Sequence, residues 1–459
     1  MPAFGPVVEG LKVGETVRLV VPQKLPLGGK VKGKKQPGLF RVYFPSRDGG
    51  RLELETTAGT IEVRDPNGQP AKDTSGQAVA KGKKVAFEVP LGAFGWYGIV
   101  VTGAASYEIS SKMVVEGNAK DRDGSMLVPW HFYYFPFTKV NEEGHPSKNW
   151  DKKFKAGAFD FESKSYWRSE IDSRGAMRSG LKGHCISKEF VEEYNKHLGR
   201  EVVKYDDCWW WGHCDAASVA SAIFTQPKAT GGLKEADLEW AATEIAMCGY
   251  ALEIRFFLGG LSNNSRSHPS HTEIPKPDPG QSVDKDIGPF HEALIKLLKQ
   301  EGGVALMDLR AEHEDGKDKS PDVWNQSVYR FRMEIEQSGT DGPGKDEEGL
   351  ARVVNVKTVI HANADNHDSA GNPEDPKGSG WNRELEYLLN YDPKGKVDAN
   401  NAANNVKKCS WSKTGKQYYL PRYIFRIKGL GGSGGPGNPK VKLAQLESLG
   451  VKRRPVFGG

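Results

Sequence analysis

The chain has 459 residues, too many for one ordinary domain, so we expect two or three domains. Hydrophobic residues make up 37% of the chain and charged residues 27%, a composition typical of globular proteins with a substantial core. The 64 Lys and Arg residues against 59 Asp and Glu residues leave a net charge of only +5, spread along the chain, which argues against a nucleic-acid-binding protein.

Other protein classes are excluded by simple patterns. No apolar run approaches the roughly 18 residues of a membrane span, so we expect none. Residues 1–8 lack the basic and apolar segments of a secretory signal, which predicts a cytoplasmic protein or one exported by a non-classical route. Five cysteines are too few for a disulfide scaffold, and their odd number leaves at least one free thiol. No organic cofactor is implied, and the oligomeric state stays open.

Short alternating runs of apolar and polar residues fill the first hundred or so positions. They predict strands over residues 16–21, 39–44, 51–55, 60–64, 84–89 and 96–102. Turn sequences such as Asp65-Pro66-Asn67-Gly68 separate them. Several short strands at this spacing predict an antiparallel β-sandwich over residues 1–121. It contains no catalytic constellation, so we interpret it as an accessory or binding domain.

An aromatic segment, residues 126–137, marks the start of a second domain, which we place at residues 122–428. So many rings in one stretch must be buried, and the face of this domain is expected to cover them. The spacing of apolar residues predicts helices over 187–197, 234–247 and 290–301, and strands over 304–309, 353–363 and 384–392. A Gly- and Pro-rich linker with a short helix and a basic tail, residues 429–459, completes the prediction.

Residues 206–220 combine three tryptophans, a glycine and Cys214 with a following run of small residues of helical character. We interpret this stretch as a loop that delivers Cys214 to the N-terminus of a helix. Unpaired backbone N–H groups and the helix dipole at such a position lower the pKa of a thiol toward the nucleophilic thiolate. The alternative is that Cys214 is one more buried cysteine beside an aromatic cluster, and the local pattern leaves both open.

The order of elements after Cys214, more helices and then antiparallel strands, is that of papain-like cysteine enzymes. Three motifs go further: the run from Trp210 to Ser221, the helix start Asp286-Ile287-Gly288-Pro289-Phe290-His291, and Val323-Trp324-Asn325-Gln326. In this order, over roughly residues 205 to 425, and with two hairpin strands after the last motif, they resemble the oomycete transglutaminase elicitors and their bacterial relatives.

The resemblance implies an α+β protein in which the β-sandwich precedes a papain-like domain with calcium-independent acyl transfer. Cys214 would attack the carboxamide of a protein or peptide glutamine, release ammonia and pass the acyl group to an amine acceptor such as lysine. The N–H of Cys214 would stabilise the oxyanion together with a nearby side chain. Trp211, Trp324 and Asn325 are the substrate-binding candidates.

The general base is the difficult assignment. The resemblance implies a His on the first of the two late strands and an orienting Asn or Asp on the second, and Asn390 matches the orienting position. The facing residue on the first strand is expected near Asn355, which is not a His. His361 shares the face of Asn355 but lies six residues further on, about 20 Å along an extended strand. Cys214, His361 and Asn390 are therefore the candidate catalytic residues.

The other histidines have different expected roles. His213 neighbours Cys214, but adjacent residues on a helix do not face each other. His291 is more typical of a helix cap or packing residue. His268 and His271 lie in a long polar loop, residues 262–286, that could bring them inward.

Three further interpretations stay open. Discharge of the same acyl-enzyme by water would make the protein a cysteine protease or deamidase. A non-enzymatic adhesin or structural protein with an inactive papain-like domain would follow if no base reaches Cys214. Finally, Gly-His-Cys occurs twice, at residues 183–185 and 212–214 with Cys208 between them, so four soft ligands could hold a structural zinc. This spacing matches no standard zinc finger, and we predict no metal.

Overall fold

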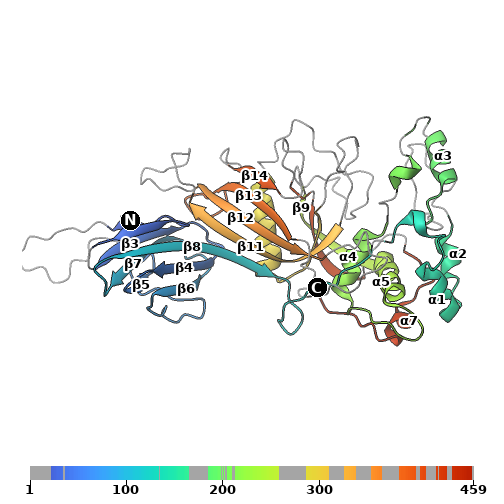
Figure 1. Ribbon diagram of the computed structural model, residues 1–459, viewed down its shortest axis with the longest axis horizontal. Helices are drawn as coiled ribbons and strands as arrows, with labels where there is room; N and C mark the ends of the chain where they lie inside the picture. The colour runs from blue at the N-terminus through green and yellow to red at the C-terminus, as the bar shows by residue number, and fades with distance from the viewer. Residues whose placement is uncertain are drawn as a thin grey trace, which may run out of the picture.

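The computed structural model describes residues 22–34, 37–133, 135–164, 184–197, 199, 201, 204–208, 212–257, 286–309, 325–337, 353–363, 382–399, 404–409, 420–421, 423–431 and 437–456. The protein is a mixed α+β structure with β-sheets at its N-terminal end, a large curled antiparallel sheet in the middle and most helices at the other end (Figure 1). Among the described helices, none has the length and apolar character needed to span a bilayer.

The N-terminal part is built from two groups of strands. The first is a four-stranded sheet in the order β1 (Gln23–Lys24), β3 (Gly38–Phe44), β7 (Gly95–Thr102) and β5 (Thr60–Arg64). The second group comprises β2 (Lys30–Gly33), β4 (Gly50–Thr56), β6 (Lys84–Val89) and β8 (Tyr107–Asn118). Buried and less buried residues alternate along β3 and β6, so the period-two pattern correctly predicted these strands. The strand predicted over residues 16–21 lies outside the described residues.

The central sheet has the strand order β14-β13-β12-β11-β10-β15-β9, and all of these neighbours are antiparallel. Its strands are β9 (Tyr250–Phe257), β10 (Ala305–Asp308), β11 (Asn325–Gln337), β12 (Val353–Ala362), β13 (Asn382–Asn390), β14 (Asn405–Cys409) and β15 (Tyr423–Leu430). Along β12 the alternate residues from Val354 to Ile360 are buried, which confirms the predicted inward face.

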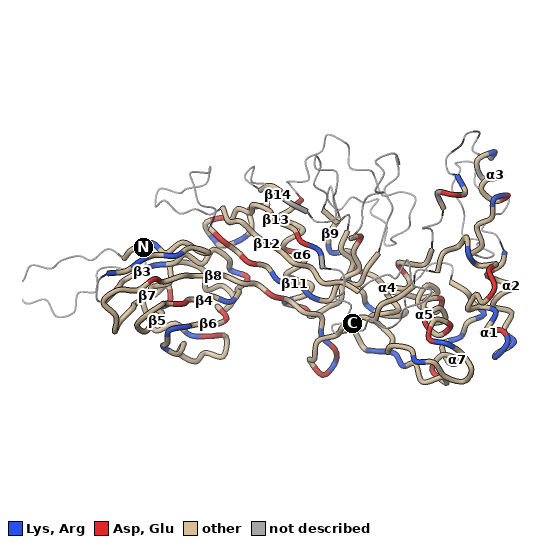
Figure 2. Tube along the Cα trace, viewed as in Figure 1, with Lys and Arg blue, Asp and Glu red and all other residues tan. Residues whose placement is uncertain are grey.

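Strand β8 joins the N-terminal strands to the central sheet. Its first part pairs with β2 and β4, and its residues 113–118 pair antiparallel with β11. Ion pairs cross this junction: Arg332 donates to Glu116, and Lys112 Nζ lies 2.6 Å from Glu334 Oε1. Figure 2 shows residues of both charges along these strands. The hydrogen-bonded sheet therefore runs without a break through the region on both sides of β8.

The helical elements are η1 (Phe137–Lys139), α1 (Pro146–Phe154), α2 (Ala158–Glu162), α3 (Lys188–His197), η2 (Tyr205–Cys208), α4 (Cys214–Ile223), α5 (Glu235–Gly249), α6 (Ile287–Leu294), the π-helical segment η4 (Ile295–Gln300) and α7 (Leu443–Ser448). All residues of α4 are buried, because α4 packs against α5 on one side and β10, β11 and β15 on the other. Helices α1 and α2 were not predicted from the sequence, although Pro146 at the first turn of α1 is a typical start signal.

The aromatic segment predicted to be buried is packed inside the protein. Trp130, Phe132, Phe135 and Phe137 are all at most 5% exposed. The indole Nε1 of Trp130 donates to the backbone oxygen of Phe224 at 3.1 Å, just beyond the end of α4. The segment therefore ties the start of the helical region to α4.

The C-terminal residues are part of the core rather than a free tail. The backbone N–H of Arg454 donates to the oxygen of Ile223 at 2.6 Å, and that of Thr225 donates to the oxygen of Lys452 at 2.8 Å. Leu446 and Val451 are buried. The prediction of a linker and basic tail is therefore corrected for residues 437–456, whose apolar side chains pack against the end of α4.

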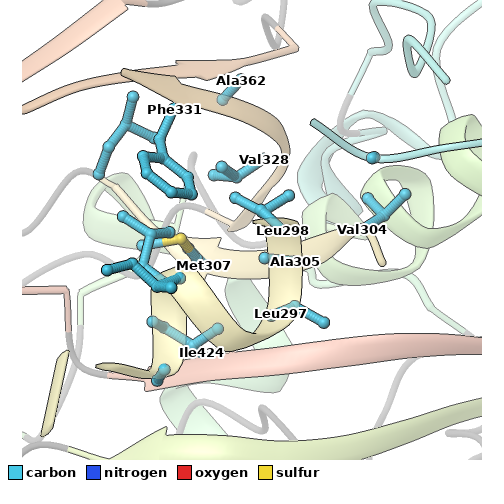
Figure 3. Packing of buried hydrophobic residues seen from close by; sticks show 14 of the residues in the cluster. Leu297, Leu298, Val304, Ala305, Met307, Val328, Phe331, Ala362 and Ile424 are labelled. Carbon is cyan, nitrogen blue, oxygen red and sulfur yellow. The ribbon is translucent and has the colours of Figure 1, made fainter. Parts of the chain in front are cut away.

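A hydrophobic cluster lies under the junction between β8 and β11 (Figure 3). Leu297 and Leu298 of η4 and Phe331 of β11 are fully buried in it. Gly117 of β8 lets the backbone of η4 come close: a Cβ added there would lie 2.8 Å from the nitrogen of Lys299 and would also collide with the Phe331 ring. Close approach of two backbones is the reason for a glycine at this position.

We expect Gly117→Ala to lower the free energy of unfolding by about 1–3 kcal/mol, because main-chain atoms of η4 cannot move aside cheaply. Urea denaturation followed by circular dichroism would measure this. Gly249→Ala is the matched control, since its added Cβ meets nothing within 4 Å, and it should change stability by less than about 1 kcal/mol. Equal destabilisation by both substitutions would contradict the steric explanation.

Candidate functional site

Cys214 is the first residue of α4, as the sequence predicted. Small side chains follow it, and Ala216, Ala217 and Ala220 are fully buried, so that the helix packs closely among its neighbours. The thiol therefore lies where the first backbone N–H groups of a helix point, a position that favours negative charge. Cys214 itself is only 2% exposed.

The side chain of Asn325 lies against the sulfur. Its Nδ2 donates to Cys214 Sγ at 3.4 Å, and its Oδ1 accepts a hydrogen bond from the Tyr423 hydroxyl at 2.5 Å. Its backbone oxygen accepts from Ser218 Oγ at 2.6 Å, which fixes the start of β11 on α4. With Oδ1 occupied by Tyr423, the amide N–H group is aimed at the sulfur. The site thus holds a donor beside the thiol.

Strand register brings a carboxylate to the same place. Asp308, the last residue of β10, pairs with Asn325, the first residue of β11, so their side chains point to the same face of the sheet. On the other side of β10, Met307 pairs with Ile424, and Tyr423 comes at the next position. Asp308 is 1% exposed. A thiol, an amide, a phenol and a carboxyl group therefore gather where three strands begin or end.

A second hydrogen bond anchors the start of α4. The hydroxyl of Tyr250, the first residue of β9, donates to Asp215 Oδ2 at 2.8 Å. Burial, and then the negative charge of Asp215, raise the pKa of Tyr250 well above its ordinary value. Tyr250 therefore stays protonated and remains a donor. This contact holds the residue next to Cys214 in place.

The predicted partners His361 and Asn390 do not form a pair. In the register of β12 and β13, Asn390 pairs with Val353 and His361 pairs with Asn382, so the two positions are eight residues apart, about 26 Å along a strand. Asn355, expected to face Asn390, pairs with Leu388 instead. The pairing differs by two residues from the predicted one, because local sequence does not determine register.

Asn390 has structural contacts of its own. Its backbone N–H donates to Asn404 Oδ1 at 2.8 Å, and its Nδ2 lies 3.5 Å from Asp398 Oδ2. These contacts hold the end of β13 to the turn that follows. Asn390 is therefore placed as a structural residue, which corrects the prediction that it orients a catalytic imidazole.

Of the three substrate-binding candidates, Asn325 is the one that the structure describes. Trp211 and Trp324 lie outside the described residues, as do His268 and His271. Sequence reasoning missed Tyr423 and Asp308, which stand in no local motif. Only the order of the strands β11, β10 and β15 brings them to Asn325.

His291 is a packing residue, as predicted. Its Nδ1 lies 2.7 Å from the hydroxyl of Tyr387, and its Nε2 lies 3.5 Å from that of Tyr391. Complete burial lowers the pKa of His291 to about 3, so the ring is neutral in the folded protein at physiological pH. It is engaged by tyrosines of the β13 region and has no described contact with Cys214.

This burial predicts a pH dependence of stability. The unfolded chain takes up a proton on His291 near pH 6.5, whereas the folded protein does so only at about pH 3. Stability is therefore complete above about pH 6.5 and falls as the pH drops through this window, by up to about 1.4 kcal/mol per pH unit from this group. Urea unfolding at about pH 7.5, 6 and 4.5 should give a smaller slope for His291→Gln than for the wild type. Parallel slopes would show that His291 is not responsible.

One group of side chains among the described residues could hold a metal ion: Glu162, His184, His213 and Glu244. These are the histidines of the two Gly-His-Cys sequences, but the cysteines are placed differently from the zinc interpretation. Cys185 Sγ accepts from Asn141 Nδ2 at 3.3 Å. Cys208 Sγ lies 3.4 Å from the backbone oxygen of Lys204.

Comparison with known proteins places the chain only distantly. No protein-family model matches it, and no curated protein matches it. The crystal structure of the GP42 transglutaminase from Phytophthora sojae aligns with 73% of this chain and 90% of its own, at 15% identity and a TM-score of 0.41. The pre-peptidase C-terminal domain of a collagenase from Bacillus anthracis aligns with 21% of this chain and 100% of its own, at 14% identity and a TM-score of 0.16. At these levels neither structure assigns an activity to this chain.

Proposed function

We propose that the protein is a cysteine acyltransferase of the transglutaminase type, with Cys214 as its nucleophile. The contact between Asn325 and the Cys214 sulfur supports this most directly, because a thiol at a helix N-terminus is joined by an amide donor that Tyr423 holds in one orientation. Asn325 also belongs to the Val323-Trp324-Asn325-Gln326 motif, one of three motifs that resemble the transglutaminase elicitors.

In this proposal the thiolate of Cys214 attacks the carboxamide carbon of a glutamine side chain. A C–S bond forms, and the carbonyl electron pair moves to oxygen, where the N–H of Cys214 and Nδ2 of Asn325 stabilise the negative charge. The intermediate collapses, the C–N bond breaks, and the nitrogen leaves as ammonia after taking up a proton. An amine then attacks the thioester, an amide bond forms, and the thiolate is released.

Asp308 is the carboxyl group that we assign to this site. Its place beside Asn325 suits a group that orients the proton acceptor for the thiol, the part that Asn390 was expected to play. His361 lies at the opposite end of β12 from Asn390, so the two are not retained as a catalytic pair. His361→Ala in the transfer assay tests whether this imidazole acts alone.

Burial of the thiol bears on the choice between transfer and hydrolysis. Cys214 is 2% exposed, and a site that excludes water protects a thioester until an amine arrives. This favours acyl transfer over the protease or deamidase alternative. The same burial is the observation that supports the non-enzymatic alternative, since a protein glutamine must gain access to the sulfur.

The deciding experiment incubates the protein with a glutamine-donor peptide and a fluorescent primary amine, with and without a calcium chelator. A covalent peptide–amine conjugate in both samples is the expected result. Peptide cleavage without conjugate would indicate a protease, and ammonia release without conjugate a deamidase. No reaction with any donor peptide would support the non-enzymatic alternative. Conjugate formed only without chelator would contradict calcium independence.

A further inference from the structure

Four buried side chains from four separate segments converge about 30 residues or more apart in sequence from their helical neighbours, close to the start of α4. Glu162 ends α2, His184 precedes α3, His213 precedes Cys214, and Glu244 lies on α5. Each is at most 2% exposed, and one ligand atom from each lies within 4.8 Å of all the others. We propose that this cluster binds one divalent transition-metal ion, with zinc the best match.

The two carboxylates are held in position by one residue. Asn438 donates from its backbone nitrogen to Glu244 Oε2 at 2.8 Å and from its Nδ2 to Glu162 Oε1 at 2.7 Å. The second oxygen of each carboxylate faces a histidine: Glu162 Oε2 lies 2.9 Å from His184 Nδ1, and Glu244 Oε1 lies 2.9 Å from His213 Nδ1. Hydrogen bonds that orient ligands from behind are typical of metal sites.

The contact between His213 and Glu244 is short but is not a hydrogen bond. Within the described part of the chain, neither His213 Nδ1 nor Glu244 Oε1 has a hydrogen-bond partner, although the two atoms are 2.9 Å apart. Buried polar atoms in folded proteins are almost always satisfied. A cation between the two residues would accept a lone pair from each and would explain why they approach without the geometry of a hydrogen bond.

The ligand set and spacing select the ion. A tetrahedral zinc ion with bonds of about 2.1 Å holds its ligand atoms about 3.4 Å apart, and the separations here run from 2.9 Å to at most 4.8 Å. Imidazole nitrogen suits zinc and similar metals, whereas calcium prefers a shell of oxygen atoms. Two carboxylates balance the charge of a divalent ion, which removes the cost of burying both uncompensated.

The surroundings indicate a structural site. The ring of Phe137 stacks on His184 at 5.6 Å and meets His213 edge-on at 4.7 Å between centroids, so aromatic side chains cover the histidines. Four protein ligands would fill a tetrahedral ion and leave no position for substrate. Because His213 is joined directly to Cys214, the ion would fix the start of α4 relative to α2, α5 and the segment around Asn438.

Metal content of the purified protein tests the proposal directly. After incubation with zinc and removal of excess, the wild type should carry about one zinc ion per chain by mass spectrometry of the elements. Glu244→Gln keeps an acceptor for Asn438 but loses the charge, and it should lower the zinc content at least about tenfold. Cys185→Ser and Cys208→Ser should retain the metal, since neither thiol belongs to the cluster. A wild type without zinc, or full occupancy in Glu244→Gln, would overturn the proposal.

Two measurements on the wild type cover the case in which Glu244→Gln fails to fold. Cobalt substitution should give the visible bands of a tetrahedral ion without a thiolate-to-cobalt charge-transfer band in the near ultraviolet. Prolonged chelation should lower Tm, and added zinc should restore it. A charge-transfer band would assign the metal to cysteines, and a Tm that ignores both treatments would count against any site. None of these results depends on acyl transfer.

Discussion

Replacement of Cys214 by Ala should abolish transfer of the fluorescent amine, lowering kcat/KM by at least about 10⁴-fold, as expected when a covalent nucleophile is removed. The reason is that no other group described at this site can form the acyl-enzyme: Asn325 and Tyr423 are held by each other, and Asp308 would give a far more labile anhydride. Conjugate fluorescence after separation of the peptide measures the loss.

Cys248→Ala is the matched control for Cys214→Ala, because Cys248 is an exposed thiol at the end of α5. It should keep the transfer rate of the wild type within about twofold. Both variants should show the circular dichroism spectrum of the wild type, so that loss of activity is not loss of fold. Conjugation that survives in Cys214→Ala would place the chemistry elsewhere.

Asn325→Ala should lower kcat/KM by about 10²- to 10³-fold with little change in KM, the effect typical of removing one oxyanion donor. The contact at 3.4 Å between Asn325 Nδ2 and Cys214 Sγ places the donor where charge develops. Tyr423→Phe removes the hydroxyl that holds Asn325 Oδ1, so the amide can rotate. We expect a smaller loss from it, about tenfold, again mainly in kcat.

Asn390→Ala separates this site from the one that the sequence predicted. Asn390 lies at the end of β13 and contacts Asp398 and Asn404, so its replacement should reduce stability and leave kcat/KM nearly unchanged. Urea denaturation and the transfer assay on the same preparation measure the two effects. A loss of kcat as large as that of Asn325→Ala would restore Asn390 to the catalytic residues.

Local pattern located most of the regular elements. Alternation predicted β6 over residues 84–89, and helical spacing predicted α5 to within two residues of its observed bounds, because each signal is complete within a short window. The start of α4 at Cys214 was also predicted. Strand register was not, since one cross-strand pairing looks like the next from within a strand. The position of Asn390 opposite Val353 shows that error.

The site was only partly visible for the same reason. Motifs drew attention to Cys214 and Asn325 separately, but their contact joins residues more than a hundred positions apart. Tyr423 and Asp308 carry no local signal. The two Gly-His-Cys sequences suggested a metal with cysteine ligands, whereas Glu162 and Glu244 were overlooked because a glutamate in a helix is ordinarily a solvated residue.

The shared strand β8 has a consequence for any shortened form of this protein. Residues 330–335 of β11 receive their hydrogen bonds on one side from β8 alone. A chain beginning at residue 122 would leave those N–H and C=O groups open to water along a bare edge, above the apolar side chains of Phe331, Met333 and Ile335. Such an edge recruits strands from other molecules. The N-terminal sheets therefore act as a guard against aggregation and cannot be detached harmlessly.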